Sequence, residues 1–319
     1  MHVLIIGVSN IVIRRVLPAL AGLDEVEQVH LASRRDISAD LIPAEKRGRV
    51  FQGYTKALSE LAPCLVYLSL PNSMHAEWTR KSLEAGFHVV VDKPAFTTLT
   101  DTESLLELGN RQGLCLAEAT VWNWHPQFEL IKNVLCEAGL SFTRVSAIFS
   151  FPPFEPTNFR CDPKLGGGSL LDLGPYATSC GRVFFGEMPT EVVCRVHSWA
   201  EGTGVDTSFS LLACYRGGRA LVGHFGFNTE YRNAVSLLGA GIFVEIGRTF
   251  TLPADFTNQL RIQREGQVSL LVPPPGDSFR LFIRQVIAAM QKLSWSQFYE
   301  AIWQDAQFLH QMRCSAGVI

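Results

Sequence analysis

The chain has 319 residues and a formal net charge of -2, and 47% of its residues are hydrophobic while 18% are charged. This length exceeds the roughly 100–200 residues typical of one domain, and the composition indicates a folded chain rather than a disordered one. A near-neutral charge without a long basic run argues against a nucleic-acid partner. No basic segment precedes the first apolar run and no apolar stretch reaches about 18 residues, so we expect a cytoplasmic protein without a membrane segment.

The eight cysteines are scattered singly, with no C-x-x-C pair and no regular spacing. This pattern favours reduced, mostly buried thiols. Structural zinc ligands usually occur in close pairs, so we expect no metal site.

Residues 1–120 alternate short apolar runs with amphipathic ones, a pattern typical of βαβ units around a parallel sheet. Strands are expected at His2–Ile6, Gln28–Ala32, Cys64–Ser69, His88–Val91 and Leu114–Glu118. Helices are expected through Arg15 and Leu20, around Met74–Ala85 and around Thr100–Arg111. Residues 1–120 are therefore predicted to form a doubly wound Rossmann domain.

Residues 121–319 are predicted to form a second, α/β domain with a large, mostly antiparallel open sheet. Strands are expected at Arg144–Phe151, Val192–Ser198, Ser208–Tyr215, Arg219–Phe227, Ala234–Leu238 and Ile242–Ile246, several of them separated by Gly-rich turns. Helices are expected around Pro126–Ala138, from near Ser169, around Phe279–Lys292 and around Trp295–Met312.

The turn after the first strand is where a dinucleotide site places its G-x-G-x-x-G fingerprint. It reads Gly7-Val8-Ser9-Asn10-Ile11-Val12, so only the first glycine is present. The motif alone is equally compatible with a nucleotide site and with an ordinary βα turn. In the first case the segment that contacts the pyrophosphate comprises Gly7, Ser9, Asn10 and Ile11.

The end of the second strand carries information about the type of cofactor. Asp or Glu at this point favours NAD, whereas Arg favours the 2′-phosphate of NADP. The sequence here is Ala32-Ser33-Arg34-Arg35. Ser33 can donate a hydrogen bond to phosphate, and Arg34 or Arg35 can supply charge. We therefore expect NADP(H), with a solvated surface arginine pair as the alternative.

The ordered series of motifs along the chain resembles the Gfo/Idh/MocA oxidoreductase family. The resemblance rests on Leu68-Ser69-Leu70-Pro71-Asn72 with His75, on Asp92-Lys93-Pro94, on Glu118 followed by His125-Pro126, and on the run from Gly166 to Tyr176. It implies an N-terminal Rossmann domain and a C-terminal α/β domain whose open sheet often forms an oligomer interface. It also implies that the cofactor site includes Leu70, Pro71, Asn72, His75, Lys93 and Glu118.

By the same resemblance, Lys93 is the active-site lysine at the end of a strand, beside the nicotinamide. Asp172 and Tyr176 are four residues apart, so on one helix they would share a face. Many family members have histidine where this chain has Tyr176. The tyrosine resembles a subset that includes sugar-nucleotide ketoreductases, in which it is the acid/base residue. The alternatives are a packed tyrosine, a surface lysine, and an aspartate that only interacts with the helix dipole.

Four further residues are candidates for substrate binding. Trp122 and Asn123, at the crossover into the second domain, are candidates for lining the substrate site, and aromatic packing is the alternative that the residue types favour. Arg160 and Lys164 precede the glycine run and are expected to bind an anionic substrate group such as a diphosphate.

The resulting hypothesis is NADPH-dependent reduction of a carbonyl on a sugar or sugar nucleotide, with Tyr176 as proton donor and Lys93 positioning the substrate oxygen. The first alternative is another small substrate, such as a dihydrodiol, a cyclitol or an imine. The second is a regulator that binds dinucleotide without turnover. A homo-oligomer, dimer or tetramer, is expected through the C-terminal sheet.

Overall fold

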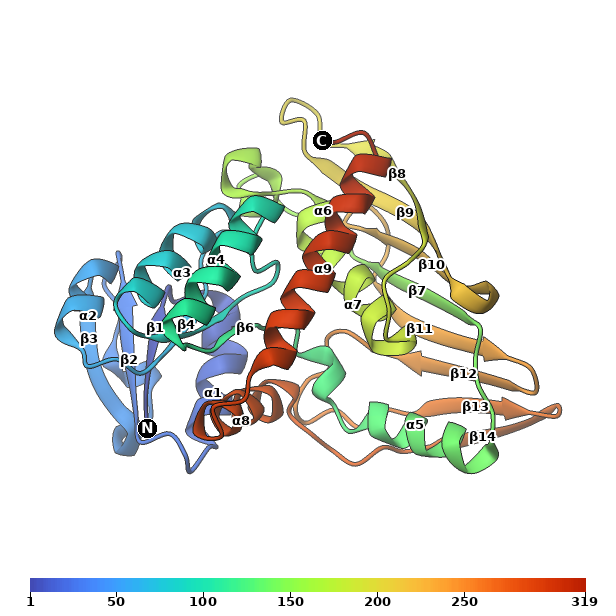
Figure 1. The fold of residues 1–319 in the computed structure, drawn as a ribbon, viewed down its shortest axis with the longest axis horizontal. Coiled ribbons are helices and arrows are strands. Elements are labelled where there is room, and N and C mark those ends of the chain that lie inside the picture. Colours follow the sequence, from blue (N-terminus) through green and yellow to red (C-terminus); the bar gives the residue numbers. More distant parts are fainter. The chain divides into compact units, whose positions relative to one another are not determined.

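A computed structural model describes residues 1–319, which form two compact units (Figure 1). The first unit comprises Met1–Ala119 with Phe279–Trp303, and the second comprises Thr120–Ser278 with Gln304–Ile319. The expected division between residues 120 and 121 places both closing helices in the second domain. The structure differs there, because the first unit includes nearly all of α8 (Ser278–Gln291) and the start of α9 (Ser296–Ser315). Tyr299 on α9 donates a hydrogen bond to the Leu114 carbonyl at 2.6 Å.

The first unit is built on a six-stranded parallel sheet with the order β3-β2-β1-β4-β5-β6. The strands are β1 (His2–Ile6), β2 (Gln28–Ser33), β3 (Arg47–Gln52), β4 (Leu65–Leu68), β5 (His88–Val91) and β6 (Leu116–Glu118). Ile6 is paired with Ala32 on one side and with Leu68 on the other, so β1, β2 and β4 end at one edge. The expected doubly wound Rossmann sheet is confirmed, and this edge is where such sheets bind ligands.

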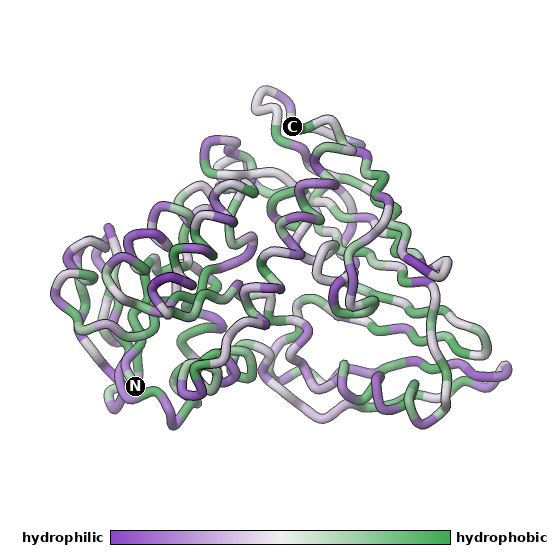
Figure 2. Tube along the Cα trace, in the orientation of Figure 1, coloured by the Kyte–Doolittle hydropathy of each residue, from purple (hydrophilic) through white to green (hydrophobic).

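Short helices connect these strands. They are a π-helical segment Val12–Val16 that runs into α1 (Leu17–Ala21), α2 (Tyr54–Glu60), α3 (His75–Glu84) and α4 (Leu99–Gln112). Neither β3 nor α2 was expected. The β3 sequence RGRVFQ has only two apolar residues, because this strand lies at the edge of the sheet and buries little. Figure 2 shows the hydrophobic runs of the parallel strands along the chain trace.

The second unit is built on an eight-stranded sheet with the order β14-β13-β12-β11-β7-β10-β9-β8. Its strands are β7 (Arg144–Ser150), β8 (Glu191–Trp199), β9 (Asp206–Tyr215), β10 (Arg219–Gly226), β11 (Arg232–Gly239), β12 (Ile242–Gly247), β13 (Leu260–Arg264) and β14 (Gln267–Leu271). All neighbouring pairs are antiparallel except β7 with β10. The predicted mostly antiparallel sheet is confirmed.

The hairpin of β13 and β14 was not expected, although its turn has a sequence signal. Glu265 and Gly266 join the strands with φ of 48° and 79°, the positive values that a tight hairpin turn requires. The flanking strands mix charged and amide residues with apolar ones, and four of the five β14 residues are exposed. The apolar alternation is therefore too weak to mark them.

One face of the second sheet is covered by helices and the other is open. The helices are α5 (Gln127–Ala138), α6 (Ser169–Asp172), α7 (Gly174–Phe185) and the end of α9 (Figure 1). Ala177, Cys180, Phe308 and Met312 belong to the core formed with the sheet. Large apolar side chains are exposed on its strands at Ile148, Val193, Leu212, Val222, Leu238, Val268 and Leu270.

All eight cysteines are free thiols. None of the helices combines the length and the hydropathy needed to cross a bilayer. No group of three or more His, Cys, Asp or Glu side chains is arranged to bind a metal ion.

Candidate functional site

The turn after β1 is shaped by one glycine and one serine. Gly7 has φ of 87°, and a Cβ there would lie 2.2 Å from the Ser69 carbonyl oxygen, so only glycine fits. Ser9 Oγ accepts a hydrogen bond from the Val12 amide at 3.3 Å and lies 2.8 Å from Ser69 Oγ. The Ser9 side chain therefore caps the helix and ties the turn to β4. Serine at the second fingerprint position is compatible with the local fold.

The end of β2 presents the three residues expected near a 2′-phosphate. Ser33 is buried, and its Oγ accepts a hydrogen bond from the Arg35 amide at 3.0 Å. Arg34 and Arg35 are exposed. The Arg34 guanidinium lies over the Tyr54 ring, 5.7 Å from its centroid, and its Nη2 is 3.8 Å from Met74 Sδ. The two arginines thus differ, since Arg34 is held by side-chain contacts.

A partly buried polar network connects the ends of three parallel strands. Asp92, the residue after β5, accepts hydrogen bonds from the Tyr67 hydroxyl at 2.7 Å and from the Ser69 hydroxyl at 2.5 Å. Ser69 also contacts Ser9, so the network reaches the turn after β1. Burial first, and then Asp92, raise the pKa of Tyr67 well above its ordinary value. The phenol therefore stays protonated and donates its hydrogen bond to Asp92. Asp92 is the residue that precedes Lys93 in the sequence.

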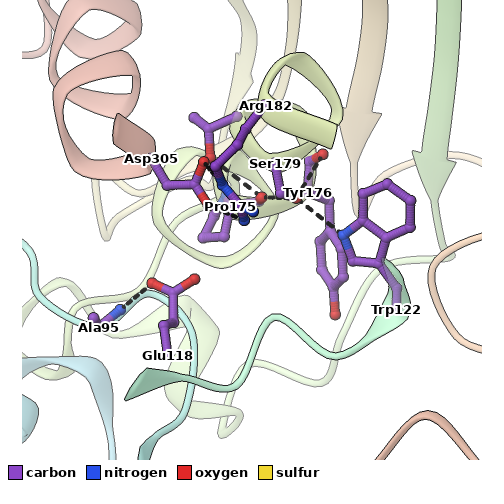
Figure 3. Close-up of polar contacts among 9 residues, drawn as sticks. Ala95, Glu118, Trp122, Pro175, Tyr176, Ser179, Arg182 and Asp305 are labelled. Atoms are coloured by element: carbon purple, nitrogen blue, oxygen red, sulfur yellow. Dashed lines mark hydrogen bonds and ion pairs between the residues drawn. The ribbon is translucent and has the colours of Figure 1, made fainter. Parts of the chain in front are cut away.

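Lys93 lies in a turn that two side chains hold in place. The imidazole of His75 is fully buried, with Nδ1 2.8 Å from the Pro94 carbonyl oxygen and Nε2 2.9 Å from that of Leu70. Burial lowers the pKa of His75. Glu118 Oε2 accepts a hydrogen bond from the Ala95 amide at 2.7 Å (Figure 3). His75 and Glu118 thus support the segment that carries Lys93.

In the second unit, Tyr176 is the third residue of α7 and is half-buried. Its ring packs edge-on against Phe149, at 4.8 Å between centroids, and lies 5.3 Å from that of Phe250. Figure 3 shows two contacts that fix α7, both within this unit. The Trp122 indole donates to Ser179 Oγ at 3.0 Å. The second contact is an ion pair between α7 and α9.

That ion pair joins Arg182 on α7 to Asp305 on α9. Arg182 Nη2 donates to Asp305 Oδ2 at 2.7 Å and Nε donates to Oδ1 at 3.1 Å, so the pair is bidentate. Burial raises the pKa of Asp305 and the guanidinium opposes that shift. The helix that carries Tyr176 is therefore anchored at two points along its length.

Asp172 and Tyr176 do not lie on one continuous helix. Asp172 is the last residue of α6, and α7 begins at Gly174. Asp172 Oδ2 accepts a hydrogen bond from Arg160 Nε at 2.7 Å. Arg160 also lies over the rings of Phe154 and Phe159, at 5.1 and 4.6 Å from their centroids.

The Arg160 guanidinium interacts electrostatically with both Asp172 and Tyr176. Burial lowers the pKa of the Arg160 guanidinium, but Asp172 and, more weakly, Tyr176 raise it, and the net shift is upward. Arg160 and Tyr176 therefore interact electrostatically within the second unit. Sequence reasoning proposed Arg160 as an anion-binding residue and did not connect it with Asp172.

The remaining candidates have different surroundings. Trp122 is 2% exposed and packs against Phe128 and Phe250, which is the core role that was its alternative. Asn123 has a buried side-chain oxygen without a hydrogen-bond partner. Lys164 is exposed, and its backbone amide donates to Asp162 Oδ1 at 2.9 Å.

Each unit has the groups for a different part of one reaction. The first unit gathers a glycine turn, Arg34 and Lys93 at the carboxyl edge of a parallel sheet, an arrangement suited to a dinucleotide phosphate and a polarised oxygen. The second unit presents the Tyr176 phenol within the electrostatic influence of Arg160, suited to proton transfer.

Two family models match the chain. Residues 1–120 match the oxidoreductase family with an NAD-binding Rossmann fold, and residues 141–246 match the GFO/IDH/MocA C-terminal domain. These matches cover well over half of the sequence.

Individual proteins are similar over most of their length. The dTDP-3,4-didehydro-2,6-dideoxy-alpha-D-glucose 3-reductase of Saccharopolyspora spinosa is 35% identical over 86% of this chain and 83% of its own. D-xylose 1-dehydrogenase (NADP(+)) 2 of Haloferax volcanii is 27% identical over 90% of this chain and 88% of its own. The structure of a 3-ketoreductase from Actinomadura kijaniata in complex with NADP and TDP-benzene matches with a TM-score of 0.91, at 29% identity, over 99% of this chain and 98% of the other. The chain belongs to the Gfo/Idh/MocA family of oxidoreductases.

Proposed function

We propose that this protein is an NADPH-dependent reductase that converts a keto group of a sugar, carried on a nucleoside diphosphate, to an alcohol. The similarity to a dTDP-keto-sugar 3-reductase, at 35% identity over 86% of the chain, carries this proposal. The match to a 3-ketoreductase crystallised with NADP and TDP-benzene supports the same cofactor and substrate class.

The residues at the carboxyl edge of the first sheet fit NADPH. The turn at Gly7 offers a backbone that no larger residue could adopt, and Ser9, Asn10 and Ile11 follow it. Ser33, Arg34 and Arg35 supply donors and charge at the end of β2, and the first carboxylate of this segment, Asp36, comes only after them. The loop Leu70–His75 and Glu118 complete the proposed cofactor site.

When bound, NADPH supplies the hydride that reduces the carbonyl carbon. Tyr176 donates the proton that the carbonyl oxygen needs, since a phenolic hydroxyl can act as a general acid. The Lys93 ammonium holds that oxygen and stabilises the negative charge that develops on it. The mechanism requires the two groups to reach the same substrate oxygen.

The other polar residues of the second unit support this chemistry. Asp172 acts as a positioning residue, because it fixes Arg160 near Tyr176. Arg160 and Lys164 provide positive charge for an anionic substrate group such as a diphosphate. Asn123 has an unpartnered side-chain oxygen at the start of the second unit and is proposed to border the substrate, whereas Trp122 supports this segment from the core.

Self-association is part of the proposal. Val193, Leu212 and Val222 lie directly opposite one another on β8, β9 and β10, and they are 39%, 40% and 50% exposed. Contiguous exposed apolar side chains of this kind mark contact surfaces. We propose a homo-oligomer formed through this face. Light scattering should give a mass of at least two chains for the purified protein and a single-chain mass for a Leu212→Glu/Val222→Glu variant.

The test of the enzymatic proposal is NADPH oxidation with a panel of substrates. Nucleotide-linked keto sugars should be reduced faster than free keto sugars, dihydrodiol-derived ketones, cyclitol ketones and imines. Faster turnover of another class would replace the proposed substrate. Binding of NADPH without turnover of any of these substrate classes would favour the alternative function, a regulator that binds dinucleotide without catalysis.

A further inference from the structure

Arg34 crosses the carboxyl edge of the first sheet. It follows β2, while Met74, which its Nη2 contacts at 3.8 Å, belongs to the loop after β4. In the sheet order β2-β1-β4, the strand between them is β1, whose turn begins at Gly7. The Arg34 guanidinium therefore contacts a segment that follows a strand two places away from β2 in the sheet, beyond the strand that leads into the proposed phosphate turn.

The Tyr54 ring supports this arginine from an element that the sequence did not reveal. Tyr54 is the first residue of α2 and is 8% exposed, and its ring lies 5.7 Å from the Arg34 guanidinium. A guanidinium over an aromatic face within about 6 Å is attracted by the ring quadrupole. This contact restricts the freedom of a long side chain that is otherwise exposed.

Tyr54 is itself fixed by the helix that follows the loop after β4. Its ring meets the Trp78 indole edge-on, at 4.9 Å between centroids and an interplanar angle of 85°. Trp78 is 8% exposed, and Lys81 Nζ lies 4.4 Å from the centre of its ring. Trp78 therefore packs against Tyr54, and Tyr54 in turn packs against the Arg34 guanidinium.

Arg35 has no comparable support. It is exposed, and its amide binds Ser33 Oγ, which fixes its backbone rather than its guanidinium. We propose that Tyr54 is a positioning residue for cofactor specificity, which pre-orients Arg34 so that this arginine, rather than Arg35, binds the 2′-phosphate. This inference rests on the proposed preference for NADPH and is independent of the carbonyl substrate.

The experiment compares two probes that differ only in the phosphate under test, 2′,5′-ADP and 5′-AMP, by calorimetric titration of the full-length protein. Tyr54→Leu removes the aromatic face but keeps apolar volume against Trp78, whereas Tyr54→Phe keeps the face. Tyr54→Leu should weaken 2′,5′-ADP about two- to fivefold, the range expected for a cation–π contact at an exposed site, and leave 5′-AMP unchanged. Tyr54→Phe should bind both probes like the unmodified protein.

Arginine variants complete the test. Arg34→Met should lose about tenfold or more in affinity for 2′,5′-ADP, the loss expected for a charge-assisted hydrogen bond, and Arg35→Met much less. Adding Tyr54→Leu to Arg34→Met should have no further effect, because the tyrosine acts through the arginine. The inference is overturned if Tyr54→Leu weakens both probes equally or neither, or if Arg35→Met is the more damaging variant.

The controls separate this inference from the proposal on which it rests. Retained 5′-AMP affinity shows that a variant is folded around the adenosine site. If the unmodified protein binds both probes equally, the NADPH preference itself is wrong. If it discriminates between them and Tyr54→Leu discriminates equally well, only the role of Tyr54 is wrong.

Discussion

Replacing Arg160 with methionine would remove the cation that faces Asp172 while keeping an unbranched side chain against Phe154 and Phe159. The Asp172 side chain is 6% exposed and that of Arg160 is 27% exposed. Breaking a buried ion pair costs about 3–5 kcal/mol because one charge stays buried without compensation. Since Arg160 keeps some access to solvent, we expect the lower end, about 3 kcal/mol, or about a hundredfold in the folding equilibrium.

The pH dependence identifies the cause of this loss. In Arg160→Met, the buried Asp172 carboxylate has lost its cation, and this uncompensated charge can be relieved by protonation as the pH falls. The difference in unfolding free energy from the unmodified protein should therefore be largest at pH 7 and smaller at pH 5. Urea unfolding followed by tryptophan fluorescence at both pH values measures this difference.

Lys164→Met is the matched control, since it removes an exposed cation four residues away. It should change the unfolding free energy by less than about 0.5 kcal/mol. A variant Arg160→Met that unfolds at the same urea concentration as the unmodified protein would refute the buried ion pair. A loss of equal size at pH 7 and pH 5 would show that packing, not charge, is responsible.

Three further predictions concern stability. Burial lowers the pKa of His125 to about 4, so the folded state binds fewer protons than the unfolded state below about pH 6.5. His125 should thus cost roughly 3 kcal/mol of stability between pH 6.5 and 4, and urea titrations of His125→Phe should show a flatter pH dependence over that window. Ser9→Ala should lose about 1 kcal/mol of unfolding free energy, because the Val12 amide loses its capping partner. The comparison is Ser73→Ala, which removes the hydroxyl of an exposed serine. Trp122→Phe should lose at least about 1 kcal/mol with the bond to Ser179, and an unchanged urea midpoint would contradict that contribution.

Most of the fold could be predicted from the periodicity of the sequence. Strands β1 and β5 have the predicted bounds, because their apolar runs are continuous and buried. The strands that were missed, β3, β13 and β14, lie at or next to a sheet edge, where exposed positions take polar residues. Exposure at the edges removes the hydrophobic signal on which such predictions depend.

The candidate site was predictable only in part. Lys93 and Tyr176 became candidates through a series of motifs, but the contacts made by neighbouring residues were not predicted. Tyr67 lies in the apolar run LVYL, which predicts a core residue, and its bond to Asp92 appears only when β4 and β5 are placed side by side. The pairing of Arg160 with Asp172 likewise depends on how a loop folds back. Contacts between segments cannot be read from the spacing within one segment.

The most direct test of the proposed mechanism is single-turnover reduction of a dTDP-linked 3-keto sugar by the NADPH-loaded protein, compared with Tyr176→Phe. The phenylalanine variant keeps the ring that packs against Phe149 and lacks only the phenolic hydroxyl, with its acidic proton. We expect NADPH affinity to be unchanged and the rate of reduction to fall by about a hundredfold or more, as for the loss of a general acid. A Tyr176→Phe variant that reduces the sugar at the unmodified rate would contradict the account.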